Sequence, residues 1–362
     1  MKKYIRKAAF WAVAIAALAL LDASSAVADI VVDPNTPPCV ATFSAHYTTI
    51  QAAVNAAASG ATIEVCPGIY AEQVTINTTL TVKGVTNTAA NTGAAVVVIP
   101  AGTFSGAFTQ ILIQATGVTL VNIGVDGTNT LSSCDFGPSL TGILFAAGSS
   151  GSLKDVALRN HYISNGSGGY CGTGIPVSAN SATSVIVTDS SVRNFDSEGF
   201  NLTATSTVTV KTTTVAPINP GANCVYANAA TVVVSNNSMA DCGVGVYVTS
   251  TVQGTVSGNT IHGGTSGGSG VFCFPVCTGL TVSGNGIFDT GAGYGMKTSS
   301  EVGGVVFENN DVSGVSNGLY LFLQPGNTIS NNTFTDAQVG VNGASGNTIS
   351  GNTYRTVTTL TQ

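Results

Sequence analysis

The stretch VSGNTI at residues 256–261 places a glycine and an asparagine between apolar residues, a pattern that weakens an ordinary β-strand. Related phrases recur along the chain: VSNNSM (234–239), VSGNGI (282–287), FENNDV (307–312), ISNNTF (329–334) and ISGNTY (349–354). The fourth residue of every phrase is asparagine, and successive asparagines are separated by 22, 26, 25, 22 and 20 residues. These asparagines are Asn237, Asn259, Asn285, Asn310, Asn332 and Asn352. The phrase therefore marks a structural repeat.

A repeat of 20–26 residues that holds two or three short strands is typical of a parallel β-helix, whose coils stack about 4.8 Å apart. The asparagine would lie at a bend between two sheets, where it tolerates left-handed backbone angles and bonds to the asparagines of the coils above and below. Towards the N-terminus the same position falls on Thr213, Ser190 and Val156. We predict an all-β fold, a parallel β-helix solenoid with a structural asparagine ladder.

A second phrase, glycine followed by apolar-x-apolar, runs in step with the first and appears as GFNL, GVYV, GVFC and GLYL. The x position of a strand of this kind faces outward, because side chains alternate between the two faces. The resulting column contains Tyr226, Tyr247, Phe272 and Tyr320. It is either a strip on which sugar rings stack or a set of exposed aromatic residues without function.

The first 28 residues have the pattern of a secretory signal peptide. Lys2, Lys3, Arg6 and Lys7 precede an apolar run from Ala8 to Leu21, which is shorter than the roughly 20 residues of a membrane span. Small residues at 26–28 then suggest cleavage after Ala28; an uncleaved anchor is the alternative. We expect residues 29–362 to form a single β-helix domain in a secreted or periplasmic protein, with no later membrane span.

The net charge of the chain limits the kinds of molecule that it can bind. Without residues 1–28, seven Lys+Arg and 16 Asp+Glu remain, a net charge of −9. So few basic residues argue against nucleic acid, which requires many phosphate contacts.

The stretch YTTIQAAVNAAASG (47–60) predicts a short helix over about 48–59. Thr48 or Thr49 can cap its N-terminus, apolar residues line one face, and Gly60 ends it. Such a helix would cover the first coil and shield its unpaired strand edge.

Residues 47–85, YTTIQAAVNAAASGATIEVCPGIYAEQVTINTTLTVKGV, resemble the opening of secreted right-handed β-helix proteins of the pectin lyase-like superfamily. The resemblance, which the repeats extend over about 50–360, implies a right-handed coil with a short N-terminal capping helix. That superfamily contains lyases, hydrolases, esterases, epimerases and proteins without activity. The chain lacks the GHG and RIK motifs of polygalacturonases, the methylesterase strand, the classical pectate lyase stretch and the DPHE of alginate epimerases.

Eight cysteines follow the leader, an even number that predicts disulfides in an oxidising compartment. Only Cys273 and Cys277 are close in sequence and no histidine lies at finger spacing, so we predict no metal site. Because coils stack in sequence order, we pair nearest neighbours. The predicted bonds are Cys39–Cys66, Cys134–Cys171, Cys224–Cys242 and Cys273–Cys277.

Residues 154–211 hold four of the seven remaining basic residues. Counted from the ladder position, Arg159 and Arg193 fall on equivalent positions of adjacent coils, and the same segment contains Lys154 and Lys211. One interpretation is a solvated face in which Asp155 pairs with Arg159 and Asp189 pairs with Arg193.

The other interpretation is a subsite for a uronate or a sulfated sugar, since arginine binds a carboxylate bidentately. His161, Tyr162 or Lys154 could then remove the acidified C5 proton. Asp196 and Glu198, two residues apart on a strand and therefore roughly 6.6 Å apart, could instead serve as an acid–base pair for hydrolysis. His262 fits a surface histidine better than a ligand.

The candidate catalytic residues are thus Arg159, Arg193, His161, Asp196 and Glu198, and the candidate substrate-binding residues are Lys154, Asp155, Tyr162, Asp189 and Lys211. Because no enzyme motif is present, we expect a secreted β-helix that binds a polysaccharide or a cell-surface glycan without catalysis. A lyase or hydrolase that acts on an acidic polysaccharide is the alternative. We expect no cofactor, with calcium and the oligomeric state left open.

Overall fold

The computed structural model describes residues 30–34, 39, 45–85, 96–100, 106–135, 137, 139–251, 253–263, 268–290, 293–299, 303–322, 325–343 and 345–361. The predicted signal peptide lies outside these ranges. Within them, no helix is long and apolar enough to cross a membrane.

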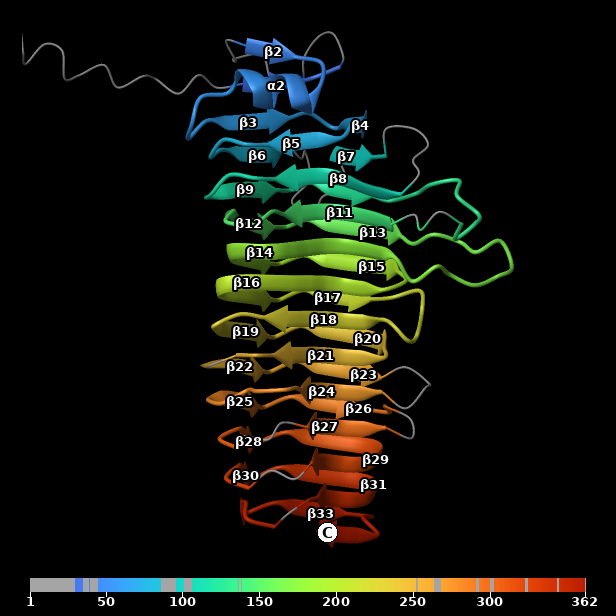
Figure 1. Ribbon diagram of the computed structural model, residues 1–362, viewed down its shortest axis with the longest axis vertical. Helices are drawn as coiled ribbons and strands as arrows, with labels where there is room; N and C mark the ends of the chain where they lie inside the picture. The colour runs from blue at the N-terminus through green and yellow to red at the C-terminus, as the bar shows by residue number, and fades with distance from the viewer. Residues whose placement is uncertain are drawn as a thin grey trace, which may run out of the picture.

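The described chain winds into a tall stack of coils (Figure 1). Each complete coil contributes a strand to three faces, here called sheets A, B and C in the order in which the chain meets them. All pairings between the described strands are parallel, and each strand pairs with the strand at the same position one coil away. The predicted all-β parallel β-helix is therefore confirmed.

Sheet A begins with β2 (Ala45–Tyr47), β1 (Ile30–Val32) and β3 (Thr62–Val65). It continues through β6 (Thr81–Gly84), β9 (Val118–Val121), β12 (Ser150–Lys154), the second halves of β14 (Gly174–Thr188) and β16 (Glu198–Lys211), β19 (Thr231–Ser235), β22 (Gln253–Ser257), β25 (Leu280–Ser283), β28 (Val306–Glu308), β30 (Thr328–Ser330) and β32 (Thr348–Ser350).

Sheet B contains β4 (Gly68–Ala71), β7 (Val96–Ile99), β10 (Gly124–Asp126), β13 (Ala157–His161), β15 (Ser191–Phe195), β17 (Thr214–Ala216), β20 (Ser238–Cys242), β23 (Thr260–Gly263), β26 (Gly286–Phe288), the first halves of β29 (Asp311–Leu321) and β31 (Thr333–Asn342), and β33 (Thr353–Arg355).

Sheet C contains β5 (Val74–Ile76), β8 (Ala107–Ile113), β11 (Ser139–Phe145), the first halves of β14 and β16, β18 (Asn223–Asn228), β21 (Val244–Thr249), β24 (Ser269–Cys273), β27 (Tyr294–Thr298), the second halves of β29 and β31, and β34 (Thr359–Thr361).

The core is the lumen of the coil. Strand residues alternate between lumen and solvent, so that in β9 Val118 and Leu120 are buried while Thr119 is partly exposed. Equivalent positions in neighbouring coils stack into continuous apolar columns, which the largest buried side chains, including Phe145, Phe195 and Phe334, help to fill. Residues that contact a ligand must therefore come from the outward-facing columns or from the loops between strands.

The helix α2 (Ile50–Ala56) covers the N-terminal end of the stack, at the top of Figure 1. The Thr49 side chain accepts a hydrogen bond from Ala52 N at 3.2 Å, and the Glu72 carboxylate accepts the N–H groups of Ile50 and Gln51. The helix is shorter than the predicted 48–59, because Ala57 already has extended backbone angles.

The corner between sheets A and B carries the predicted ladder. Each asparagine donates from Nδ2 to the Oδ1 of the next, at 2.9–3.0 Å, through the whole series from Asn237 to Asn352. That Oδ1 also accepts the backbone N–H of the asparagine in the coil above, as Asn285 Oδ1 does from Asn259. The same position holds Val156, Ser190 and Thr213 in earlier coils, as predicted.

The ladder asparagines are not the left-handed residues of the corner, which corrects the sequence interpretation. The positive φ belongs to the residue directly before each of them: 55° at Asn236, 63° at Gly258 and 56° at Asn309. This residue makes the turn, while the asparagine that follows points inward and is buried. The glycine and asparagine of the phrase therefore have separate roles.

A second amide pair, Asn327 and Asn347, stacks at the corner that leads into sheet A, and the sequence analysis missed it. Asn327 Nδ2 donates to Asn347 Oδ1 at 3.0 Å, and Asn327 Oδ1 accepts Val305 N at 3.1 Å. The sequence indicates this pair by a GNT triplet that occurs at 326–328 and again at 346–348.

Four disulfides join the cysteines that are nearest in sequence, as predicted. They are Cys39–Cys66, Cys134–Cys171, Cys224–Cys242 and Cys273–Cys277, with sequence separations of 27, 37, 18 and 4. Bonds of this range remain local because the coils stack in sequence order. No cysteine in the described part of the chain is free.

Candidate functional site

The two arginines meet on the outer face of sheet B. Arg159 on β13 pairs in register with Asp126 on β10 above it and with Arg193 on β15 below it, so the three residues form one column, here called the arginine column. Arg159 Nε lies 2.8 Å from Asp126 Oδ2. The predicted stacking of Arg159 on Arg193 thus agrees with the register of the strands.

A chain of amides runs beside the arginine column. Asn194 Nδ2 donates to Asn160 Oδ1 at 3.0 Å, and Asn160 Nδ2 donates to Asp126 Oδ1 at 3.0 Å. Burial raises the pKa of Asp126, but hydrogen bonds from Thr128, Arg159 and Asn160 outweigh this effect and hold the pKa below its usual value. Asp126 is therefore a charged carboxylate that orients Arg159, and the sequence analysis missed it because it lies one coil away.

The predicted ion pairs of Asp155 with Arg159 and of Asp189 with Arg193 are wrong. Both aspartates are the left-handed residues of the corner before β13 and β15, with φ of 52° each. Both side chains therefore start from the turn and not from the face of sheet B. Asp189 Oδ1 accepts a hydrogen bond from Thr212 Oγ1 at 2.6 Å. Among the described residues the ion pairs are Lys83–Glu64 and Arg159–Asp126.

Lys154 and Lys211 lie on sheet A, around the corner from the arginines. Both pair in register with Thr188, one from each neighbouring strand, and both are exposed. The structure therefore places these two candidate substrate-binding residues in a different column from Arg159 and Arg193.

His161 points into the lumen, so the expectation of a base beside the arginines is wrong. Asn160 has a φ of 61°, and this left-handed residue breaks the alternation that would have put His161 on the face of Arg159. His161 is fully buried, with Nε2 2.9 Å from Gln110 Oε1 and Nδ1 without a partner. Burial lowers the pKa of His161 to about 3.

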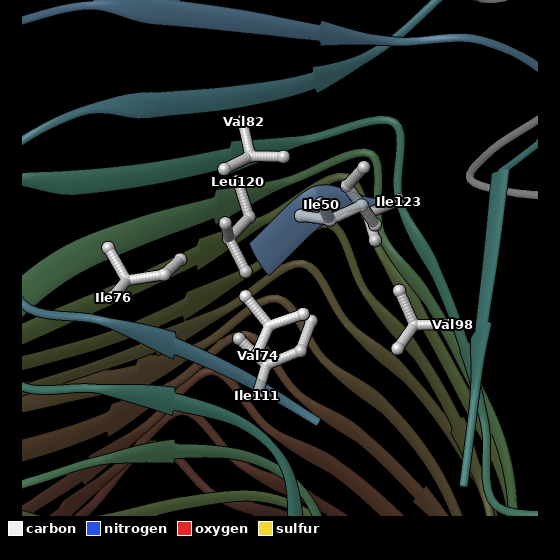
Figure 2. Close-up of a pocket in the computed structure, with 8 residues that line it drawn as sticks. All are labelled: Ile50, Val74, Ile76, Val82, Val98, Ile111, Leu120 and Ile123. Atoms are coloured by element: carbon white, nitrogen blue, oxygen red, sulfur yellow. The ribbon is translucent and has the colours of Figure 1, made fainter. Parts of the chain in front are cut away.

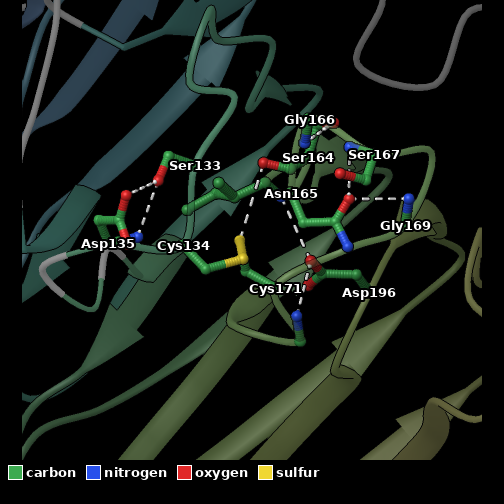
Figure 3. Close-up of a disulfide and its surroundings, with 12 residues drawn as sticks. Ser133, Cys134, Asp135, Ser164, Asn165, Gly166, Ser167, Gly169, Cys171 and Asp196 are labelled. Atoms are coloured by element: carbon green, nitrogen blue, oxygen red, sulfur yellow. Dashed lines mark hydrogen bonds between the residues drawn. A yellow bond between two sulfur atoms is a disulfide. The ribbon is translucent and has the colours of Figure 1, made fainter.

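Asp196 is a structural anchor and not one member of an exposed carboxylate pair. It lies in the turn after β15, is 1% exposed, and accepts the N–H groups of Ile163, Gly172 and Gly174 at 3.2, 3.1 and 2.6 Å. Figure 3 shows it beneath the loop that the disulfide Cys134–Cys171 holds. Burial raises the pKa of Asp196 although these donors favour the carboxylate.

The turn also separates Asp196 from Glu198, which begins β16, so the two residues are not on one strand as predicted. Tyr162 belongs to the same disulfide-held loop, where its ring meets Tyr170 edge to face at 5.6 Å. The structure therefore assigns Asp196 and Tyr162 to the loop rather than to the arginine column.

Glu198 lies at the upper end of a second surface, on sheet C. Its carboxylate accepts Asn201 Nδ2, and its Oε1 accepts Asn223 Nδ2 at 3.4 Å. Burial raises the pKa of Glu198, and the two amide hydrogen bonds oppose this shift.

The aromatic strip is the outward column of sheet C below Asn201. Here the strand register aligns Tyr226, Tyr247, Phe272, Lys297 and Tyr320 on consecutive coils. The ring centroids of Tyr226 and Tyr247 are 5.3 Å apart, and those of Tyr247 and Phe272 are 4.8 Å apart and stacked. The four aromatic residues predicted for this column all lie on it.

Further residues widen the strip, which we define as the five residues above with Phe274, Tyr294 and Phe322. The Lys297 ammonium lies 4.9 Å from both the Phe272 and the Tyr294 ring centroids. The ring centroids of Tyr294 and Tyr320 are 5.1 Å apart. Lys297 was missed because its GMKT phrase (295–298) ends in threonine instead of an apolar residue.

Phe274 and Phe322 form the exposed edge of the strip. They are 42% and 48% exposed and lie 6.2 Å from Phe272 and 6.4 Å from Tyr320, respectively. On sheet B, by contrast, the ring centroids of His262 and Phe288 are 5.2 Å apart, and among the described residues no further ring continues this pair.

Two other places in the described structure differ from the arginine column and the aromatic strip. A small void in the lumen beneath α2 is lined only by apolar side chains, and Figure 2 shows Ile50 of the helix among them. These residues are Ile50, Val74, Ile76, Val82, Val98, Ile111, Leu120 and Ile123. Asp33, Cys39 and Cys66 form a cluster of ligand atoms, but the two sulfurs are bonded to each other. Neither place offers groups for a sugar or a metal ion.

Comparisons with known proteins agree with the architecture. Solved structures that share the fold include a double mutant of the periplasmic alginate epimerase AlgG, which is 14% identical with a TM-score of 0.55; the match covers 78% of this chain and 64% of that chain. The A-module of the Azotobacter vinelandii mannuronan C-5 epimerase AlgE4 is 15% identical with a TM-score of 0.54, and the match covers 86% of this chain and 92% of that chain. DFA-IIIase from Arthrobacter chlorophenolicus A6 is 15% identical with a TM-score of 0.60, and the match covers 82% of this chain and 83% of that chain.

No curated protein sequence matches the chain. The family model of the right-handed β-helix region matches residues 94–251, 180–302 and 217–356, which together span more than half of the chain. The chain is therefore a member of the right-handed β-helix family.

Proposed function

We propose that this protein binds a carbohydrate chain along the aromatic strip of sheet C. The observation that carries the proposal is the continuity of the strip: partly exposed rings follow one another on adjacent coils, with neighbouring centroids 4.8–5.3 Å apart. Aromatic faces are suited to the apolar faces of sugar rings, and a flat β-sheet presents them in a line. A linear glycan lying along the axis of the coil fits this arrangement.

Lys297 indicates the charge of the ligand. It lies between the rings of Phe272 and Tyr294, and no carboxylate among the described residues pairs with it. A cation without an anionic partner in the middle of a ligand strip favours a ligand that supplies a carboxylate or a sulfate. We therefore propose an acidic glycan, either a polysaccharide or a chain at a cell surface.

The alginate and mannuronan epimerases among the structural neighbours support a carbohydrate ligand, although at 14–15% identity they share only the fold. The four disulfides fit a secreted or periplasmic location, where such ligands occur.

Binding without catalysis is the function we favour, because the catalytic residues expected from the sequence do not come together. His161 faces the lumen, Asp196 anchors a loop, and the arginines lie on sheet B. A lyase or hydrolase remains the alternative, favoured by one observation: Glu198, whose pKa is raised by burial, lies at the head of the strip.

Affinity measurements on matched variants test the proposal. Tyr247→Ala should weaken binding of an acidic oligosaccharide about tenfold, since an aromatic contact contributes roughly 1 kcal/mol beyond its buried area. Phe288→Ala, which removes an aromatic residue from sheet B, should leave the affinity unchanged. Equal affinities for wild type and Tyr247→Ala would refute binding on the strip.

An assay for unsaturated and reducing products, with and without calcium, separates the two functions. The proposal expects no product from uronic-acid polysaccharides under either condition. Product formation that Glu198→Gln abolishes would establish the enzymatic alternative instead.

A further inference from the structure

We propose that the arginine column on sheet B is a second binding site, which holds one carboxylate or sulfate group of a glycan between the guanidinium groups of Arg159 and Arg193. The aromatic strip lies on sheet C, so this site is separate from the proposed function and does not depend on it.

The arrangement of the two guanidinium groups is the first argument. Arg159 and Arg193 occupy paired positions on neighbouring strands of sheet B, whose backbones are about 4.8 Å apart, and no acidic residue lies between them in the column. Like charges on neighbouring positions of a sheet repel each other, and an anion bound by both removes the repulsion. Arginine also offers its donors as a rigid fork that matches the geometry of a carboxylate or sulfate.

The hydrogen bonds of the column are the second argument. Asp126 engages Arg159 through Nε, which fixes the guanidinium plane and leaves its terminal nitrogens for a ligand. Arg193 is exposed, and within the described residues a terminal nitrogen of its guanidinium donates a long hydrogen bond of 3.4 Å to Ser191 Oγ. One arginine is thus oriented in advance, while the other is without an anionic partner.

The surroundings of Arg193 are the third argument. The column continues below it with Ala216 and then, one coil further, Ala240, whose side chains end at Cβ. The nearby aspartates of the corner do not reach the arginines, because Asp189 bonds to Thr212 and the ion pair of Arg159 is with Asp126. The net charge of Asp126, Arg159 and Arg193 together is therefore positive, in a chain whose overall net charge is −6.

The experiment measures affinity by calorimetry for three disaccharides: one with a uronic acid, one neutral but sulfated, and one without charge. A disaccharide is short enough to occupy a single face. Arg193→Ala should weaken binding of at least one charged probe tenfold or more, and Arg193→Lys should weaken it several-fold, since lysine keeps the charge and loses the fork. The two charged probes show whether the site takes carboxylate, sulfate or both.

Arg355→Ala is the matched control, because Arg355 is an exposed arginine at the equivalent outward position of β33, in the last coil of sheet B. It removes the same charge from the protein and should change the affinity less than twofold. Asp126→Asn should tighten binding about two- to fivefold by removing a neighbouring negative charge, whereas a column that only stabilises the fold would show no gain.

Variants on the two sheets separate this inference from the proposed function. If Arg193→Ala weakens the charged probe and Tyr247→Ala does not, the second site is supported whatever the strip binds. If only Tyr247→Ala weakens it, or if Arg193→Ala and Arg355→Ala act alike, the second site is refuted and the proposed function is unaffected. Binding of the uncharged probe alone would also refute it.

Discussion

The corner between sheets A and B is built in two ways along one molecule. In the later coils, from Asn237 to Asn352, it contains amides that hydrogen-bond from coil to coil, and all of them except Asn352 are buried. In the earlier coils the same position holds Ile123 and Val156, both buried, and no amide. The backbone turn is the same in both regions, since a left-handed residue precedes Val156 and Asn285 alike.

The difference shows that the left-handed residue determines the turn, and that the side chain after it determines what joins the coils. The later coils are joined by amides and carry the aromatic strip. The earlier coils instead carry the Arg159–Asp126 ion pair, the Asp196 anchor and the disulfide Cys134–Cys171. The ion pair of Arg159 and the buried carboxylate of Asp196 therefore lie in the coils that lack the amide ladder.

The largest effect is expected from removing an amide within the ladder. Asn285 Nδ2 donates to Val256 O and to Asn310 Oδ1, and its Oδ1 accepts from Asn259. Asn285→Val should lower the free energy of unfolding by about 3–5 kcal/mol, because it leaves several buried polar groups unpaired. Urea unfolding followed by circular dichroism measures this. Asn352→Ala, at the half-exposed end of the ladder, should lower the free energy of unfolding by clearly less.

The next effect is the dependence of stability on pH, which His161 in the earlier coils should cause. The pKa of His161 is lowered to about 3 in the folded protein, so between this value and its unfolded pKa of about 6.5 the unfolded chain binds one more proton. Stability should therefore fall as the pH drops below about 6.5, by up to about 1.4 kcal/mol per pH unit from this residue. His161→Gln should remove that part of the dependence. Parallel pH profiles for both proteins would contradict it.

A smaller effect is expected at the Asp196 anchor. Asp196 Oδ2 accepts the N–H groups of Ile163 and Gly172, and Oδ1 accepts that of Gly174, so in Asp196→Asn the amide nitrogen leaves at least one of these N–H groups without its acceptor. We expect a loss of about 2 kcal/mol and faster hydrogen exchange in residues 162–174. Unchanged exchange in this loop would show that the carboxylate does not anchor it.

The smallest change in stability should come from the opposite substitution at this corner, in which asparagine replaces valine. Val156→Asn offers the Ile123 N–H an Oδ1 acceptor of the kind that Asn259 N–H receives from Asn285. We expect a change in the free energy of unfolding within about 1 kcal/mol, because the new amide gains backbone partners in exchange for lost apolar packing. A loss as large as that of Asn285→Val would show that the two corners differ in more than the side chain.

Much of the fold could be predicted from the sequence because stacking repeats local patterns at one interval. The asparagine phrase predicted the ladder, and the Gly-apolar-x-apolar phrase predicted the column of Tyr247 and Phe272. The disulfide pairs followed from the order of the coils.

The charged residues were harder to place, for two physical reasons. A single left-handed residue, Asn160, turns His161 into the lumen, and no pattern in the sequence signals this change of face. In addition, the partner of Arg159 is Asp126, 33 residues earlier, because parallel stacking pairs a residue with the coil above and not with its own corner. Local spacing therefore predicted the wrong partners for Arg159 and Arg193.

The structure of the protein in complex with an acidic oligosaccharide tests the central claim most directly. We predict sugar rings over Tyr226, Tyr247 and Phe272 along the axis of the coil, with an anionic group at Lys297. Sugar density at saturating ligand that leaves sheet C empty would contradict it.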